Sequence, residues 1–243
     1  MKMKEKLLLG VFALVLPMST TAQAGLINGG SLLNQAGANL LEQWLGVGDQ
    51  DFTNIWSGSA GDTAAGWHSS VDGVRNTVNI YDVSYGGNSY LIGGYSDTAW
   101  SSGYGHYVTD GSAFIFNLTT STIMTQAASA WPVDPNHPVT DRYSLNLNGA
   151  FFATYGGGYD MFGGNRRLGF YAYVNGAFSY GGPRPGLNIL GLSGQTRMLV
   201  NGLETFTFAD ATPQNEVPEP ATVLLFGTGL AGLVSLRRRR AKK

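Results

Sequence analysis

Glycine and aromatic residues alternate through most of this chain, and the pattern limits the folds open to it. Residues 25–216 hold 31 of the 35 glycines, about twice ordinary usage. Aromatic residues recur between the glycines in strand-sized pieces, which argues against disorder. The pattern predicts many short strands joined by tight turns. We therefore expect a mainly β (α+β) domain, a two-layer antiparallel β-sandwich with a few peripheral helices.

Two helices are expected near the start of this domain. Residues 31–45 carry apolar side chains at steps of three and four, which is typical of an amphipathic helix. Ser31 can cap its start and Gly46 can end it. A shorter helix over residues 64–70 would point Trp67 inward.

From residue 77 onward the period of the apolar residues changes to two, which indicates strands. Within residues 77–84, Val78 and Ile80 face one way while Tyr81 and Val83 face the other. Residues 85–88 would make the turn of a hairpin. Further strands are expected at 52–57, 89–93, 113–118, 143–147, 159–162, 168–174 and 203–208, with loops at 125–140 and 181–186.

Residues 1–24 have the pattern of a secretory signal peptide. Three lysines precede an apolar stretch at 7–16, and Ala22 and Ala24 form a small-residue cleavage site, so the mature chain would start at Gly25. Ten apolar residues are too few to span a membrane. We expect export by the Sec machinery and cleavage by signal peptidase.

Residues 214–243 form a second targeting segment, in which a motif, an apolar run and a basic tail follow one another. Pro218 and Pro220 lack amide protons and keep the chain extended around Glu219. Residues 221–236 carry no charge, and as a helix they reach about 24 Å, a marginal anchor for a bilayer core of about 30 Å. The basic tail, 237–243, favours a cytoplasmic C-terminus. The motif is Val217-Pro218-Glu219-Pro220, and the tail begins with Arg237, Arg238, Arg239 and Arg240.

These three parts, in this order, resemble the PEP-CTERM sorting domain of bacteria. The resemblance implies recognition by an exosortase, a membrane protease that cuts near the Pro-Glu-Pro motif. It also implies a Gram-negative host, a transient anchor in the inner membrane, and release to the cell surface or the extracellular matrix. The alternative is a plain tail anchor with a basic flank.

The charge of the domain differs from that of the whole chain. Residues 25–216 hold six arginines, no lysine and 14 acidic residues, whereas nine of the 15 basic residues lie in the two targeting segments. An acidic, lysine-free domain is a poor partner for nucleic acid. The chain has no cysteine, so it has neither a disulfide nor a thiol nucleophile.

The domain itself, residues 25–213, resembles the TLDc domain over roughly residues 32–213. The resemblance implies two packed antiparallel sheets; relatives protect against oxidative damage, and no agreed catalytic residues transfer. This chain departs from the family at Val71, where a cysteine is frequent, and at Phe152-Ala153, where Gly-Pro is usual. The residues that carry the resemblance are Trp67-His68, Val71-Asp72-Gly73, Thr77-Val78, Leu91-Ile92-Gly93-Gly94-Tyr95, Trp100, 110–118, Tyr155-Gly156-Gly157-Gly158-Tyr159-Asp160 and Phe206-Thr207-Phe208.

The candidate metal ligands do not have metal-site spacing. His68, His106 and His137 are 38 and 31 residues apart, without the short pairing that metal sites favour. Asp49 and Asp51 begin like a calcium loop, but the glycine and the final acidic residue of such a loop are missing, so turn capping is favoured. We predict no metal, no cofactor and no catalytic residue.

The function expected from these signals is that of an exported, non-enzymatic protein of the cell surface or matrix. One alternative is a matrix hydrolase that uses Asp72 and Asp160, although backbone capping by these carboxylates is favoured. Another is a module that binds extracellular polysaccharide through exposed aromatic rings, unless those rings lie in the core. The aromatic candidates are Trp100, Tyr104, Tyr107, Trp131 and Tyr180.

Overall fold

The computed structural model describes residues 25–212 apart from 104, 127–142, 170–171, 177–178 and 185. The predicted signal peptide and the sorting segment lie outside these residues. Within them the helices are α1 (Gln35–Leu45) and α2 (Ala64–Val71), and neither is long and apolar enough to cross a bilayer. The strands are β1 (Ile27–Asn28), β2 (Gln50–Ser59), β3 (Thr77–Tyr85), β4 (Asn88–Ser96), β5 (His106–Val108), β6 (Phe114–Asn117), β7 (Thr122–Gln126), β8 (Leu145–Leu147), β9 (Thr154–Tyr155), β10 (Met161–Phe162), β11 (Ala172–Val174), β12 (Tyr180–Gly181) and β13 (Thr196–Asp210).

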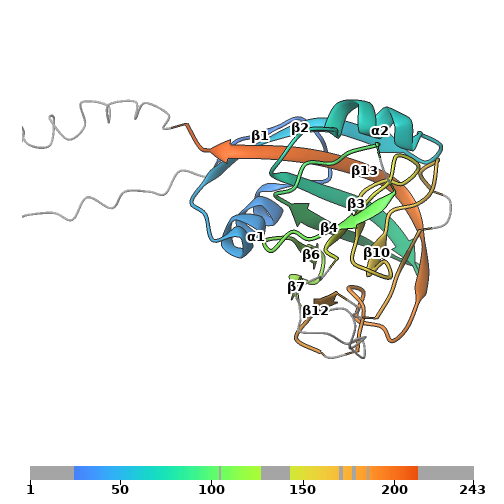
Figure 1. The fold of residues 1–243 in the computed structure, drawn as a ribbon. Coiled ribbons are helices and arrows are strands. Elements are labelled where there is room, and N and C mark those ends of the chain that lie inside the picture. Colours follow the sequence, from blue (N-terminus) through green and yellow to red (C-terminus); the bar gives the residue numbers. More distant parts are fainter. Residues whose placement is uncertain are drawn as a thin grey trace, which may run out of the picture.

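The domain is mainly β and its strands pair almost entirely in the antiparallel sense, as predicted. The strand order is β12-β7-β6-β4-β3-β13-β11-β10-β9-β8-β5, and β2 pairs with the other side of β13. Only β1 and β2 are parallel among the described strands. The two predicted sheets are therefore continuous with each other, because β13 pairs with strands of both (Figure 1).

β13 is much longer than the predicted strand at 203–208. Its first residues, Thr196 to Met198, pair with β11, and residues from Leu199 onward pair with β3 and β2. Asn201-Gly202 is a pair typical of hairpin turns. Here it lies inside the strand at a register shift instead, so the chain continues where the local sequence indicates a turn.

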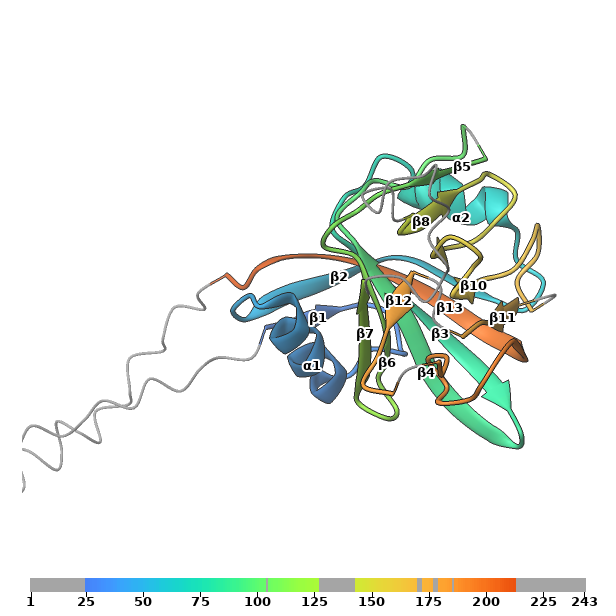
Figure 2. The same ribbon diagram turned by 60° about the horizontal axis from the view of Figure 1, so that its bottom comes forward.

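Each face of the main sheet has its own apolar core. Val78 and Ile80 pack with Leu41 of α1 on one face, and Tyr81 and Val83 pack with residues of β8–β11 and α2 on the other. Figure 2 shows α1 and the β8–β10 region on opposite sides of the main sheet. The predicted alternation along residues 77–84 is confirmed.

The first helix begins later than predicted. Asn34, not Ser31, is the N-cap, since its side chain accepts a hydrogen bond from the backbone N–H of Gly37 at 2.9 Å. Ser31 is used elsewhere: its N–H and hydroxyl both donate to the carboxylate of Glu204, at 2.8 and 3.0 Å. The end at Gly46, with φ of 69°, is as predicted.

The second helix and the first hairpin also follow the prediction. Thr63 caps α2, and Trp67 is fully buried. Tyr85 pairs with Asn88 across the turn between β3 and β4.

Several later strands are shorter than predicted. β8, β10 and β11 keep only the ends of their predicted segments. Glycines with positive φ at 156, 158, 164 and 169 end the extended chain around them. The predicted loop at 125–140 is wrong at Thr125 and Gln126, which belong to β7, and its residues from 127 lie outside the described part.

A carboxylate fixes the loop that leads into β6. Asp110 is buried and accepts hydrogen bonds from the Thr98 N–H at 2.8 Å, from the Ser112 hydroxyl at 2.7 Å and from the Ser96 hydroxyl at 3.1 Å. Burial acts to raise the pKa of this carboxyl, but these donors outweigh it and the pKa lies below its ordinary value.

Replacing this carboxyl should make stability less dependent on pH. In the folded chain the pKa of Asp110 is depressed, so its ionised form stabilises the fold above an unfolded pKa of about 4. That stabilisation is lost as the pH falls through the folded pKa. Asp110→Asn should therefore lower the free energy of unfolding at pH 7, with a difference that shrinks towards about pH 3. Urea unfolding at several pH values measures it. Asp82→Asn removes the same charge elsewhere, and an equal, pH-independent effect of both variants would contradict the assignment.

Candidate functional site

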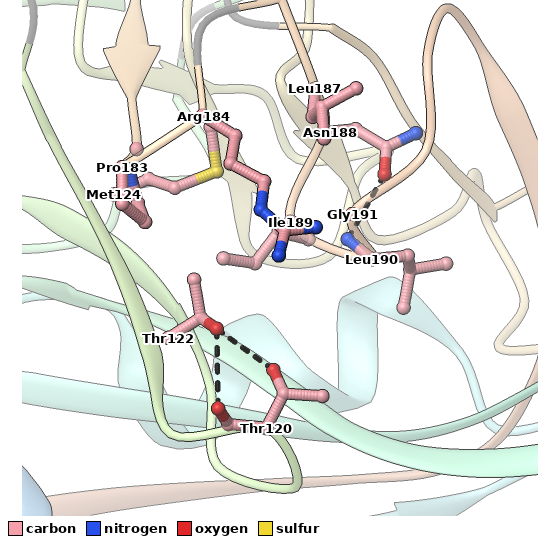
Figure 3. Close-up of a pocket in the computed structure, with 11 residues that line it drawn as sticks. Thr120, Thr122, Met124, Pro183, Arg184, Leu187, Asn188, Ile189, Leu190 and Gly191 are labelled. Carbon is pink, nitrogen blue, oxygen red and sulfur yellow. Dashed lines mark hydrogen bonds between the residues drawn. The ribbon is translucent and has the colours of Figure 1, made fainter.

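A pocket lies between the β6–β7 hairpin and the loop that follows β12. It has a volume of about 450 Å³ (Figure 3). The loop is fastened to β6, because the Asn117 amide donates to the Ile189 carbonyl at 3.2 Å. Its lining residues are Thr120, Thr122, Met124, Gly182, Pro183, Arg184, Leu187, Asn188, Ile189, Leu190 and Gly191.

The lining of this pocket combines one cation with several polar groups. Arg184 is the only charged residue in the lining, and its guanidinium group extends into the pocket. Thr120 and Thr122 bring two hydroxyl oxygens 3.0 Å apart. The side chain of Asn188 already has hydrogen-bond partners within the loop. Its amide donates to the Gly194 carbonyl and the Thr196 hydroxyl, and its Oδ1 accepts from the Leu190 N–H. A cation beside hydroxyl groups suits a small anionic or hydroxylated ligand, and the lining holds no acid–base pair.

His68 and Asp72 form a close pair at the C-terminal end of α2. Nδ1 of His68 lies 2.6 Å from Oδ1 of Asp72, and Nε2 lies 3.1 and 3.0 Å from the carbonyl oxygens of Asn148 and Phe151. Carbonyl oxygens only accept, so Nε2 carries a proton. Nδ1 faces Oδ1 of Asp72, so both ring nitrogens of His68 have hydrogen-bond partners.

The carboxylate of this pair also holds a neighbouring loop. Oδ2 of Asp72 accepts from the Ser102 N–H at 2.8 Å. Partial burial acts to raise the pKa of Asp72, but hydrogen bonds from Ser102 and His68 outweigh it and the pKa is lowered. Through these contacts the pair joins the end of α2 to the loops that hold Ser102 and Asn148.

A shallower hollow of about 550 Å³ lies between the start of α2 and the two loops that contact this pair. Ser102 and Asn148, which contact the pair, are in its lining together with Thr63 and Arg166. Arg166 has φ of 60°, held by backbone bonds to Ala150 and Ala64. Neither His68 nor Asp72 lines this hollow.

Asp160, the second carboxylate of the predicted hydrolase alternative, lies in the core. Asp160 is fully buried and its Oδ2 accepts from the Ser179 N–H at 2.8 Å. Its carboxylate packs against the Cα of Gly156, where a side chain would overlap it. Asp72 and Asp160 line neither the pocket beside Arg184 nor the hollow at α2, and both accept backbone N–H groups, as the predicted capping role requires.

The predicted aromatic face is divided between the core, the surface and residues outside the description. Trp100 is 1% exposed, and its indole N–H donates to the Thr77 hydroxyl at 2.9 Å. Tyr180 is also buried, and its hydroxyl donates to the Ser144 carbonyl. Both therefore lie in the core. Tyr107 is half-buried on β5, and Tyr104 and Trp131 lie outside the described residues.

Tyr107 belongs to a row of rings that sequence reasoning missed. Its ring centroid lies 4.8 Å from that of Tyr143 and 6.1 Å from that of Tyr159. Tyr159 in turn contacts Phe162, which contacts Tyr173. The five rings come from four segments of the chain, so no single local pattern indicates the row. Tyr159 has φ of 63°, which is uncommon for a bulky residue.

The remaining metal candidates have structural partners. Asp51 accepts backbone N–H groups from Leu26 and Thr212, which agrees with capping and not with a calcium loop. His106 lies on β5, opposite Leu147, and His137 is outside the described part. Among residues 25–212 as described, no three His, Cys, Asp or Glu side chains gather as a metal would require.

Comparison with known families places one signal beyond the folded domain. Residues 216–240 match the model of the PEP-CTERM protein-sorting motif. The match contains the predicted 217–220 motif, the apolar run and Arg237 to Arg240, so the predicted sorting signal is confirmed. No curated protein matches the chain.

Proposed function

Since the chain carries a PEP-CTERM protein-sorting motif at residues 216–240, and that motif implies processing by an exosortase, we propose the following life history. The precursor is exported through the signal peptide at 1–24 and held briefly in the inner membrane by residues 221–236. It is then cut near Pro218–Pro220. The product acts at the cell surface or in the extracellular polysaccharide matrix of a Gram-negative bacterium. The observation that carries the proposal is the family match.

For the released domain we propose a binding role without catalysis. Three features support it: both His68 nitrogens are occupied, Asp160 is buried in the core, and the pocket beside Arg184 has hydroxyl groups but no acid–base pair. A hydrolase built on Asp72 and Asp160 has no support from their positions. The TLDc resemblance remains part of the proposal, with protection against stress or association with polysaccharide as the roles it implies.

The processing route predicts a defined product. Mass spectrometry of material washed from the extracellular matrix should show a chain that starts at Gly25 and ends between Pro218 and Pro220. Glu219→Ala changes only the motif and should leave the anchored precursor in the membrane fraction, whereas Glu204→Gln, which changes a carboxylate within the folded domain, should still be cut. Secreted chains that keep Lys243 would contradict the proposal.

The non-catalytic role has its own test. The purified 25–216 chain should show no turnover of matrix sugars or peptides above that of a heat-denatured sample. Turnover that disappears on one polar-to-alanine change in the Arg184 pocket would show that the domain is an enzyme.

A further inference from the structure

One carboxylate fastens both ends of the folded domain. Oδ1 of Asp51 accepts the Leu26 N–H at 2.7 Å, and Oδ2 accepts the Thr212 N–H at 3.2 Å. These two hydrogen bonds lower the pKa of Asp51, and the bond from Leu26 has the larger effect. Phe52 donates to the Leu26 carbonyl and Ala211 donates to the Asp49 carbonyl. The first and last described segments therefore lie on either side of the start of β2.

Both targeting segments must leave the domain at this place. Gly25 is buried against Gln50, and a side chain at Gly25 would overlap the Gln50 carbonyl. The signal peptide ends at the residue before it. On the other side only 213–220 separate Thr212 from the apolar run, and eight extended residues reach at most about 28 Å. A domain held by either segment therefore has its Asp51 end within reach of the membrane.

The surface around Asp51 combines exposed aliphatic side chains with the exposed carboxylates of Asp49 and Asp210. Leu26 is 46% exposed and Val47 is 42% exposed. A hollow of about 570 Å³ opens beside Val47, and its lining includes Trp44, Leu45 and Phe208 as well as the polar side chains of Gln50 and Asp210. Figure 1 shows the C-terminal end of β13 and the start of the described chain on the same side of the domain as α1. Exposed aliphatic side chains next to two chain exits fit contact with lipid.

We propose that this end of the domain, formed by Leu26, Val47, Asp51 and Thr212, faces the lipid surface in the unprocessed precursor, and that Asp51 is the positioning residue that holds both chain ends there. The inference rests on the proposed membrane-held precursor. It adds which face of the domain meets the bilayer before the protease acts.

Single cysteines test the orientation, since the chain has none of its own. Val47→Cys and Leu199→Cys replace exposed apolar residues, 42% and 55% exposed. Asp210 lies eleven positions after Leu199 in β13, which is about 35 Å along the strand. Each full-length variant is labelled with a polarity-sensitive fluorophore and inserted into phosphatidylcholine vesicles that contain brominated lipid. Quenching at position 47 should exceed quenching at position 199 several-fold.

The role of Asp51 is tested in the same system. Asp51→Asn in the Val47→Cys chain should lower the quenching several-fold towards the Leu199 value. Asp62→Asn is the matched control, because its carboxylate accepts a backbone N–H from Ser59 away from the chain ends, and it should leave quenching unchanged. Equal effects of the two variants would overturn the positioning role of Asp51.

The outcomes separate the inference from the proposal beneath it. A full-length chain that does not sediment with the vesicles would overturn the membrane-held precursor, and the orientation with it. A chain that sediments but is quenched equally at 47 and 199 would overturn the orientation alone.

Discussion

Gly93→Ala should lower the free energy of unfolding by at least about 3 kcal/mol, because the added methyl group has no free space. Gly93 lies in β4 opposite Ile80 of β3. A Cβ there would overlap the backbone carbonyl oxygen of Asn79 and would lie 2.6 Å from Cζ of Phe116. The carbonyl belongs to the neighbouring strand and cannot rotate away, so the two strands would have to separate.

The measurement is urea unfolding of the mature chain followed by tryptophan fluorescence. Gly111→Ala is the control, since a Cβ at Gly111 would meet no atom within 4 Å and its φ is not in the left-handed region. That variant should be neutral or slightly stabilising. A similar small effect of Gly93→Ala would show that β3 and β4 are not packed as described.

Asn79→Leu should destabilise the fold by about 4 kcal/mol, because it removes the centre of a buried polar chain. The indole N–H of Trp67 donates to the Thr205 hydroxyl at 2.9 Å, and that hydroxyl donates to Oδ1 of Asn79 at 2.8 Å. The Asn79 amide donates to the Tyr155 hydroxyl at 2.9 Å. All four residues are fully buried, so the substitution leaves the Thr205 and Tyr155 hydroxyls without these partners.

Asn201→Leu is the matched control for this change. The Asn201 amide donates to the Ser84 hydroxyl at 2.9 Å in an exposed position, where water can replace the bond. The double variant Asn79→Leu/Thr205→Val should lose less stability than the sum of the two single variants, because their side chains share one bond. Additive losses would contradict a connected chain.

Much of the fold follows from short-range patterns. The alternation along residues 77–84 predicts which of Val78, Ile80, Tyr81 and Val83 enters each core, and the structure agrees. The glycine pair at 86–87 predicts the turn of the first hairpin. These features depend only on neighbours in sequence, so the sequence pattern carries them.

The predicted bounds of helices and strands are wrong where contacts with residues far away in the chain determine the structure. Ser31 has the right type for an N-cap, but Glu204, 173 residues away, binds it, and Asn34 takes the cap. The extension of β13 through Asn201-Gly202 depends on β3 and β2 beside it. Local propensity contains no information on such pairings.

The sites divide in the same way. The sorting segment is linear, so its motif, apolar run and basic tail were predictable and match a family model. By contrast, the two ends joined by Asp51 and the ring row through Tyr107 come from segments far apart in the chain. Trp100 is a ligand candidate by residue type alone, and the structure buries its ring in edge-to-face contacts with Trp67 and Tyr155.

During export the strands cross the membrane in chain order, so the position of β13 in the chain determines when the sheet can be completed. β13 lies between β2 and β3 and also pairs with β11, yet it is the last strand of the described chain. The two halves of the sheet cannot be joined before residues 196–210 have crossed, because β13 is the strand that pairs with both. The sheet is thus completed only after nearly all of the described chain has crossed, shortly before the sorting segment follows.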